Sequence, residues 1–452
     1  MRWRLATLGV TVALVAAGGL TYVATQGYVD LRPRTHPTSA SAVPTPALAL
    51  ASLDPAAPMP TRAGVGRLLR RAATAPDLGG ALSGLVVDAS TGTPLFVRRP
   101  DVTLPPASTT KLLTAVAALD TLGPDATLTT AVVRAGRTLY LVGGGDVTLA
   151  ATKRAAYPAP ATLTQLAART AAAVPGKRFV LRYDDTLWQG PSQAAGWRPS
   201  YVSGGNVAPV SALEVDEGRL SGFTSLHPQP RVGDPALAAA TEFGKALVSA
   251  GVRLEGGVQR GTAPRVPPIA TVASAPVSEL VQRMLTDSDN DLAEALARTV
   301  ALHERLPPTF DGAGRALTSV LRDAGLPVDR LRLYDGSGLS TLDRVTARLL
   351  VAVLRLVAQR PGLAAVSAGL PIAGFTGTLA ERYRQRLTRA GAGVVRAKTG
   401  TLAGVNTLAG AVVDADGRLL VFAFLTNRAT GPDATEPALD RLAAELADCG
   451  CR

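Results

Sequence analysis

The chain has 452 residues, 47% of them hydrophobic and 4% aromatic, and its formal net charge is +12. This length suits two or three domains around a large core, and the hydrophobic fraction excludes a disordered chain. The positive charge suits an anionic envelope or membrane surface, although solubility alone could explain it. The dispersed arginines argue against nucleic acid as a partner, because nucleic-acid binding favours a concentrated basic block.

The N-terminus has the pattern of an export signal. Arg2 and Arg4 precede an uncharged stretch from Leu5 to Tyr28 that is mostly apolar. It is long for a cleaved signal and just long enough to span a bilayer, so residues 1–28 are either a signal peptide or a signal anchor. Residues 29–64 are rich in Pro and Ala, which predicts an extended linker. The protein is therefore expected outside the cytoplasm, in the cell envelope, with a membrane anchor as one of two outcomes.

The globular part opens with a predicted hairpin of strands 84–88 and 94–98, and a helix over 112–119 follows. Ser108 stands after a proline pair at the start of this helix, where free N–H groups favour an anion or a developing oxyanion. The helix is expected to be buried on one side, because four apolar residues share one stripe: Leu112, Leu113, Val116 and Leu119.

Lys111 follows Ser108 by one helical turn, so its ammonium can reach the Ser108 hydroxyl. If burial lowers its pKa, Lys111 can take the Ser108 proton and activate a hydroxyl that is a weak nucleophile alone. The alternative is a capped helix with an exposed lysine, and for Ser-x-x-Lys by itself that outcome is far commoner.

Residues 129–273 differ in texture from the rest, with short strands, Gly and Pro turns and two predicted helices, Leu163–Ala173 and Pro235–Ala250. We interpret them as an inserted, β-rich domain, flanked by residues 65–128 and 274–452 of a single domain. Helices and then strands return after the insert. The expected segments are helices at Val277–Leu285, Leu292–Leu302, Ala313–Ala324, Val345–Gln359 and Pro437–Leu446, and strands at Thr407–Val413 and Leu419–Leu425.

Other catalytic and metal-binding patterns find little support. Only three histidines are present and no Gly-x-Ser-x-Gly elbow occurs, which leaves little room for a Ser–His–Asp triad. Cys449 and Cys451 are the only cysteines; they could pair in an oxidising compartment, and their spacing fits no Cys–His zinc site. No metal or cofactor is predicted.

Two later triplets join Ser108 and Lys111. Ser288-Asp289-Asn290 lies in a turn between two predicted helices, and Lys398-Thr399-Gly400 follows the strand-like Val394–Ala397. In this order, Ser-x-x-Lys, Ser-x-Asn and Lys-Thr-Gly form the signature of penicillin-binding proteins and active-site serine β-lactamases. Only five of the 47 basic residues are lysines, and two of the five stand in these motifs. Arginine could not replace a lysine that must become neutral to act as a base.

With these motifs the chain resembles class C low-molecular-mass penicillin-binding proteins, the D-alanyl-D-alanine carboxypeptidases/endopeptidases of peptidase family S13. The resemblance spans about Gly84 to Leu425. Class A β-lactamases have a far shorter segment between the first two motifs, and they carry a Glu-x-x-x-Asn loop that does not follow Ser288 here. Further matching stretches are Tyr140–Asp146, Tyr334–Ser340, Gly377–Leu379 and Ala397–Leu402.

The resemblance implies an α/β fold: a β-lactamase/transpeptidase-like domain, with an antiparallel sheet flanked by helices and a helical subdomain, plus the β-rich insert. It implies a serine-type D-Ala-D-Ala carboxypeptidase, with endopeptidase activity also open, that trims peptidoglycan stem peptides through an acyl-enzyme on Ser108. β-Lactam antibiotics would be covalent inhibitors. Two alternatives remain, a β-lactamase and an inactive wall-binding or scaffold protein.

The resemblance also implies the catalytic roles. Ser108 attacks the carbonyl carbon of the D-Ala-D-Ala bond, with Lys111 as the base. Ser288, near Lys398, relays a proton to the leaving amine, and Asn290 holds the substrate amide.

The third motif is expected to bind the substrate. Lys398, Thr399 and Thr401 suit the terminal carboxylate, and the backbone N–H groups of Ser108 and Thr401 suit the oxyanion. Gly400 is expected to lack a side chain so that the substrate backbone can approach the strand.

One position departs from the family. Thr341 stands where family members often carry an arginine that is thought to hold the acidic end of the peptide's diamino-acid side chain. The segment Asp184–Trp188, with Trp197 after it, resembles the stretch that contacts the amine end, and either Asp184 or Asp185 could be the match.

Overall fold

The structure is a computed structural model that describes residues 56–451 apart from 177, 221–228 and 429–430. The predicted export segment, and all of the predicted linker before residue 56, lie outside the described residues. The described residues belong to one compact unit. Its first helix, α2 (Arg62–Ala72), starts a little before the expected boundary because Thr61 caps it: the Thr61 hydroxyl accepts the Gly64 N–H at 3.1 Å.

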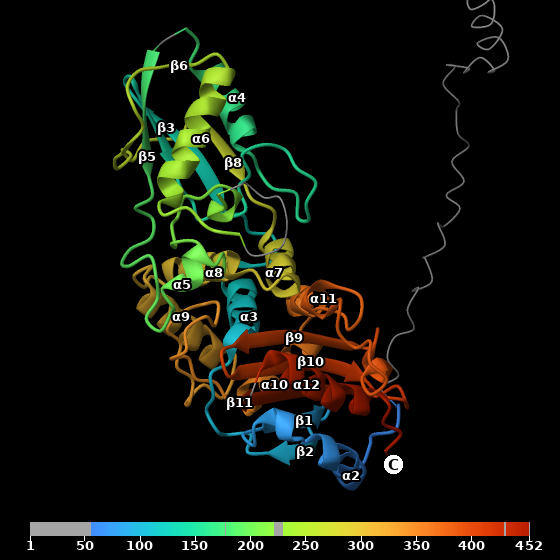
Figure 1. Cartoon of the computed structure of the whole chain (residues 1–452). Coiled ribbons are helices and arrows are strands. Elements are labelled where there is room, and N and C mark those ends of the chain that lie inside the picture. The colour runs from blue at the N-terminus through green and yellow to red at the C-terminus, as the bar shows by residue number, and fades with distance from the viewer. Residues whose placement is uncertain (1–55, 177, 221–228, 429–430, 452) are drawn as a thin grey trace, which may run out of the picture. The chain divides into compact units, whose positions relative to one another are not determined.

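Among the described residues, one of the two sheets is five-stranded and antiparallel, and it is built from early and late strands of the chain (Figure 1). The order along it is β2-β1-β11-β10-β9, so the first and last segments of the chain build one sheet and β9 is an edge strand. The predicted hairpin and both predicted late strands are present. The strands are β1 (Ser83–Asp88), β2 (Pro94–Arg98), β9 (Val395–Leu402), β10 (Val405–Val413) and β11 (Leu419–Asn427).

Helices cover both faces of this sheet, which explains why its central strands are apolar at nearly every position. On β11, Phe422 and Phe424 pack into one core with α2 and α12 (Pro432–Ala447), while alternate residues such as Ala423 pack into a second core with α10 (Ala347–Gln359). Successive strand residues point to opposite faces, so one strand contributes to both cores.

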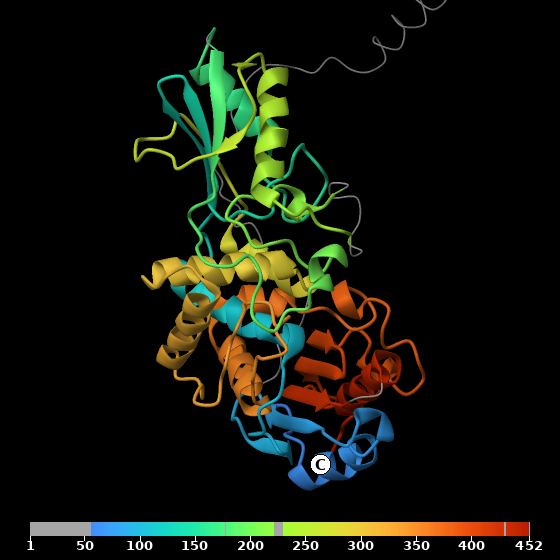
Figure 2. The ribbon, with the colours of Figure 1, turned by 60° about the vertical axis from the view of Figure 1, so that its left-hand side comes forward.

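The helical part of the fold surrounds α3 (Thr110–Leu122), the helix that follows Ser108 (Figure 2). Every residue from Thr110 to Leu119 is buried, so the expectation of a single buried face is wrong. Helices α7, α8, α9 and α10 pack around α3, and an apolar helix without a polar face is the form that such a position requires. The remaining members of this group are α7 (Val277–Thr286), α8 (Asn290–His303), α9 (Phe310–Asp323) and α11 (Ala364–Gly369).

Residues 129–273 contain a second, mixed sheet in the order β6-β5-β4-β3-β8, with β7 paired to β5. It has its own apolar core against α4 and α6. Because all described residues belong to one unit, an inserted domain with these boundaries remains a prediction. The elements are β3 (Thr129–Ala135), β4 (Thr138–Val142), α4 (Leu163–Ala173), β5 (Arg178–Asp184), α5 (Ser200–Ser203), α6 (Pro235–Ser249), β6 (Arg253–Leu254), β7 (Gln259–Arg260) and β8 (Ala270–Ala273).

The C-terminus is fastened to the start of the folded chain. Cys449 and Cys451 form a disulfide, and the Cys451 carbonyl accepts hydrogen bonds from the Thr61 N–H at 2.8 Å and the Thr61 hydroxyl at 3.2 Å. Among the described residues, no single helix is long and apolar enough to cross a membrane. One pair bent by 113°, Ala347–Gln359 with Pro361–Gly369, meets the length and composition criteria together.

Candidate active site

Ser108 lies in a single 3₁₀ turn, Ala107–Thr109, that leads into α3. Its neighbours are buried while Ser108 itself is half-buried, so its hydroxyl faces an accessible space. Ala107 has a φ of +49°, in the left-handed region that a residue with a side chain rarely adopts. Strained backbone of this kind persists where its surroundings determine it, and it is commoner at active sites than elsewhere.

The Lys111 amine is fully buried and has three oxygen neighbours. Its Nζ lies 3.0 Å from Ser108 Oγ, 2.6 Å from Asn290 Oδ1 and 2.8 Å from the Ser337 carbonyl oxygen. A neutral amine carries two N–H groups and one lone pair. Two of the neighbours can only accept, so they take the two N–H groups. The lone pair then faces the remaining neighbour, the Ser108 hydroxyl, which is the arrangement that a general base requires.

Burial also favours the neutral form of the Lys111 amine. Desolvation lowers the pKa of Lys111 to about 8, although the carboxylates of Asp335 and Glu294 work in the opposite direction. A lysine in water titrates more than two units higher. A substantial fraction of Lys111 is therefore neutral in mildly alkaline solution.

The two acceptors of the lysine are themselves held in place. Glu294 is buried and accepts the backbone N–H groups of Gly336 and Ser337 at 2.8–3.1 Å. The peptide whose carbonyl faces Lys111 is held on its other side by Asp335, whose Oδ1 accepts the Gly338 N–H at 2.7 Å. Asn290 donates its Nδ2 to the Asn206 carbonyl at 2.8 Å, so its Oδ1 must point the other way, toward Lys111.

Ser288 and Lys398 form the second pair of the site. Lys398 Nζ lies 2.9 Å from Ser288 Oγ and 3.0 Å from the Thr399 carbonyl oxygen. Lys398 is fully buried, and burial followed by the positive charge of Lys111 lowers its pKa well below the ordinary value. Ser288 has a φ of +59° in the turn between α7 and α8, and Asp289, not Ser288, caps α8 by accepting the Leu292 N–H at 2.9 Å.

The Lys-Thr-Gly-Thr motif lies inside β9, whereas the sequence analysis placed it after a strand. Ala397 donates its N–H to the Pro371 carbonyl, on the outer side of β9, away from β10. Because the direction of the N–H groups alternates along a strand, those of Thr399 and Thr401 point to the same open edge. The hydroxyls of these threonines also have partners, Thr378 Oγ1 for Thr399 and Glu436 Oε1 for Thr401, each at 2.8 Å.

The structure shows a packing reason for a glycine at position 400. A Cβ at this position would lie 2.2 Å from Thr407 Oγ1, 2.8 Å from the Pro106 carbonyl oxygen and 3.0 Å from Ala107 Cβ. These atoms belong to the neighbouring strand and to the turn that carries Ser108. The missing side chain thus lets β9 pack directly against the turn that carries Ser108, and the expected approach of the substrate backbone at Gly400 remains a prediction.

The positions linked to the diamino-acid side chain give a mixed result. Thr341 is exposed and its hydroxyl donates to the Gly196 carbonyl at 3.3 Å, while the Arg344 guanidinium donates to the Thr341 carbonyl at 2.8 Å. The Asp184 carboxylate accepts hydrogen bonds from the Thr186 N–H, the Thr186 hydroxyl and the Ala263 N–H. Asp185 pairs with Arg260 at 3.0 Å. The amine contact of either aspartate remains a prediction.

The structure therefore brings together the eight residues predicted for catalysis and substrate binding: Ser108, Lys111, Ser288, Asn290, Lys398, Thr399, Gly400 and Thr401. Sequence reasoning missed Glu294, Asn206 and Glu436, whose contacts arise from long-range packing and have no local pattern. Ser337 and Thr378 stand in two of the matching stretches, and that was the only signal for them.

Comparisons with known proteins agree with this geometry. The model of the "D-Ala-D-Ala carboxypeptidase 3 (S13)" family matches residues 66–229 and 222–446. The chain is 40% identical over 475 residues to "Carboxypeptidase DacB" of Mycolicibacterium smegmatis, covering 100% of this chain and 99% of that one. It is 31% identical to "D-alanyl-D-alanine carboxypeptidase" of Actinomadura sp. strain R39, covering 82% of each. The crystal structure of penicillin binding protein 4 (dacB) from Haemophilus influenzae has the same fold, with a TM-score of 0.70, 21% identity and coverage of 84% of this chain and 98% of that one.

Proposed function

This chain belongs to the D-Ala-D-Ala carboxypeptidase 3 (S13) family, and from that premise we propose that Ser108 is its nucleophile and Lys111 its general base. The protein is a serine-type D-alanyl-D-alanine carboxypeptidase that acts on peptidoglycan stem peptides. The observation that supports the residue assignment most directly is the Lys111 amine, which is buried, flanked by two obligate acceptors and 3.0 Å from Ser108 Oγ.

Acylation begins with a proton transfer. Lys111 Nζ takes the Ser108 hydroxyl proton while Oγ forms a bond to the carbonyl carbon of the penultimate D-Ala. The carbonyl oxygen becomes an oxyanion, which the backbone N–H groups of Ser108 and Thr401 stabilise. The Thr401 N–H on the open edge of β9 suits this role, since a substrate peptide can lie along that edge as an added strand.

Collapse of the tetrahedral intermediate breaks the C–N bond. The leaving amine of the terminal D-Ala needs one proton, and the Ser288 hydroxyl supplies it and is reprotonated through Lys398 or Lys111. Lys398, Thr399 and Thr401 bind the terminal carboxylate, and Asn290 contacts the substrate amide. Water then attacks the ester, one of its protons passes to Ser108 Oγ, and the shortened peptide leaves with a free carboxylate.

We extend this route to three further properties. β-Lactams acylate Ser108, because the opened ring stays attached and no leaving group diffuses away. Cleavage of cross-linked peptides, the endopeptidase reaction, uses the same acyl-enzyme. A peptidase of stem peptides works outside the cytoplasm, where residues 1–28 either anchor it to the membrane or have been removed.

Labelling with a fluorescent penicillin tests the assignment. Wild-type protein should form one covalent adduct, located by intact-mass and peptide analysis on the peptide that contains Ser108, and folded Ser108→Ala should form none. An adduct that persists in Ser108→Ala would show that Ser108 is not the nucleophile. Rapid turnover of the penicillin would identify a β-lactamase instead, and an absent adduct in wild-type protein would favour a scaffold.

A further inference from the structure

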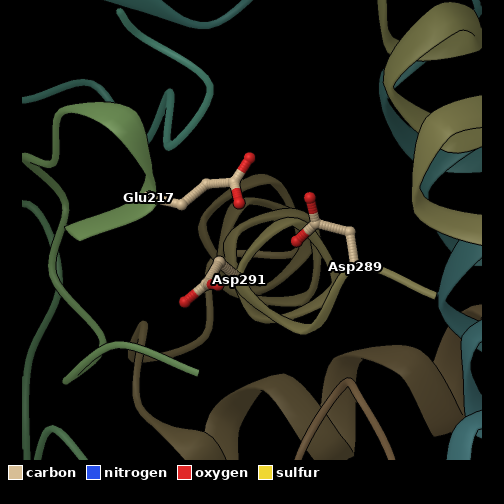
Figure 3. A group of neighbouring side chains, drawn as sticks. All are labelled: Glu217, Asp289 and Asp291. Carbon is tan, nitrogen blue, oxygen red and sulfur yellow. The ribbon is translucent and has the colours of Figure 1, made fainter. Parts of the chain in front are cut away.

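Three carboxylates meet at the N-terminus of α8, directly behind the Ser288–Asn290 turn. Glu217 lies in residues 129–273, and Asp289 and Asp291 lie at the start of α8. The Glu217 and Asp289 carboxylates face each other, and Asp291 lies beside them (Figure 3). One oxygen of each lies within 4.8 Å of the others, and all three side chains are buried. Such a group could hold a cation, so its charge balance decides what it does.

Arginines compensate these carboxylates. Arg283 of α7 pairs with Glu217 and, at 3.1 Å, with Asp289. Arg219 donates to Glu217 at 2.7 Å, and Arg231 lies 3.0 Å from Asp291. Three guanidinium groups thus pair with these three carboxylates. The cluster is an ionic link inside the protein.

This link joins two parts of the chain that are distant in sequence. Residues 206–217 and Arg231 reach the turn at four points. The Asn206 carbonyl accepts from Asn290, the Ala208 N–H donates to Asp291 at 2.7 Å, Arg231 pairs with Asp291, and Glu217 reaches Asp289 through Arg283. The contacts converge on Ser288–Asp291, the turn that presents Ser288 to Lys398 and Asn290 to Lys111.

The backbone on both sides of the link is strained. Ser288 has a φ of +59°, and Asp216, Glu217 and Gly218 have successive φ values of +51°, +55° and +62°. The left-handed conformation is unfavourable for residues with a side chain, so two non-glycine residues in a row need compensation from their surroundings. The conformation turns the Glu217 carboxylate inward to Arg283, where it is 1% exposed.

We propose that Glu217 is a positioning residue for acylation: through Arg283 and Asp289 it holds the Ser288–Asn290 turn in its strained, catalytically competent conformation. Residues 206–217 and Arg231 thereby set the geometry of a site whose nucleophile lies about a hundred positions earlier in the chain. A cavity of about 140 Å³ beside the turn, lined by Arg219, Arg231 and Arg283, leaves room for the turn to relax when the link is cut. The proposal rests on the proposed function.

Acylation kinetics of the full chain with a chromogenic β-lactam test the proposal. Glu217→Gln removes the charge but keeps the size, and it should lower the acylation rate constant at saturation by about 10- to 100-fold, the loss that a small displacement of catalytic groups causes. The dissociation constant of the non-covalent complex should not change, because Lys398, Thr399 and Thr401 still bind the carboxylate. An unchanged rate constant, or a loss that resides in binding, would overturn the proposal.

The control is Asp216→Asn, which removes a carboxylate from the same strained turn. Its partners are Arg154 and the Ala151 N–H, outside the Ser288–Asp291 turn, so near-normal acylation is expected. An equal loss in both variants would show that the turn's fold matters and not the Glu217 link.

A double variant separates positioning from general stability. In a Ser288→Ala background the effect of Glu217→Gln should shrink, because part of what Glu217 positions is gone. A fully additive effect would contradict the proposal. If Glu217→Gln does not fold, Glu217→Asp keeps the charge but retracts the carboxylate from Arg283. It should lower the same rate constant, and a wild-type value would refute the link. Labelling of wild type and its absence in Ser108→Ala test the proposed function separately.

Discussion

At the level of single residues, the chemistry depends on how often Lys111 is neutral. Because burial lowers its pKa to about 8, the protonated form predominates below that pH and cannot accept the Ser108 proton. The acylation rate constant should therefore rise about tenfold for each pH unit up to about 8 and level off above it. Stopped-flow acylation by a β-lactam between pH 6 and 10 measures the profile. A flat profile would show that Lys111 is not the titrating base.

Two variants test whether Lys111 is the group that titrates in this profile. Lys111→Arg keeps the positive charge but cannot become neutral, so it should fold and fail to acylate. Glu294 is a second group that titrates nearby, since burial and then Asp335 raise its pKa to about 8. Glu294→Gln should keep the rise in rate but move it to lower pH, because the Glu294 carboxylate raises the pKa of Lys111. If the rise disappears in that variant, it belongs to Glu294.

Substrate choice should depend on Thr341. Its neutral hydroxyl, already donating to Gly196, offers a free side-chain carboxylate little that an amide lacks. The enzyme should discriminate weakly between free-acid and amidated diamino-acid stem peptides, or favour the amide. Thr341→Arg should shift the preference toward the free acid by about 1–3 kcal/mol, the scale of a hydrogen bond to a charged group. The measurement is kcat/KM on paired synthetic peptides for both proteins.

A strong preference of the wild type for the free acid would contradict this expectation. Arg344 would then be the first cation to test, because its guanidinium donates to the Thr341 carbonyl and so lies beside the same position.

At the level of elements, β9 and the Ser108 turn act as one piece because Gly400 lets them touch. Gly400→Ala would place a methyl group 2.2 Å from Thr407 Oγ1 and 3.0 Å from Ala107 Cβ. We expect a loss of about 1–3 kcal/mol in the free energy of unfolding, as overpacked cores show. Acylation should slow as well, because the turn that carries Ser108 must move. Thermal unfolding and penicillin labelling measure the two effects.

Gly66→Ala is the matched control for this substitution. Gly66 lies in α2, and nothing stands within 4 Å of the position its Cβ would take. Alanine there should keep or raise stability and leave acylation unchanged. Equal losses in both variants would mean that the contact with the Ser108 turn is unimportant.

The elements themselves were largely predictable, because periodicity and caps are local. The helices at Leu163–Ala173 and Val277–Leu285 and the strand at Leu419–Leu425 were placed to within a few residues. Burial around α3 was underestimated, since a single stripe in the sequence cannot show how many helices pack around it. The extent of β9 was missed because Lys398, Thr399 and Thr401 are polar, and the burial of Lys398 and Thr399 depends on the site that they form.

For the whole molecule, the sequence located the site residues but not their supports. Three short motifs, which begin at positions 108, 288 and 398, predicted that Ser108, Ser288 and Lys398 lie close together. Nothing local predicted that Asn206 would orient Asn290 or that Glu217 would reach Asp289 through Arg283. These contacts arise from tertiary packing, and each partner taken alone looks like an ordinary polar residue.

The fastening of the two chain ends has a mechanical consequence. Tension applied to the chain before Thr61 enters the fold at α2, where the Cys451 carbonyl is bonded to Thr61 and the C-terminal segment shares the pull. Helix α2 packs on β2, at the opposite edge of the sheet from β9, with β1, β11 and β10 between them. Force applied to the chain before Thr61 would therefore enter the sheet at β2, three strands away from β9, and through the C-terminal helix α12, whose Glu436 accepts from the Thr401 hydroxyl.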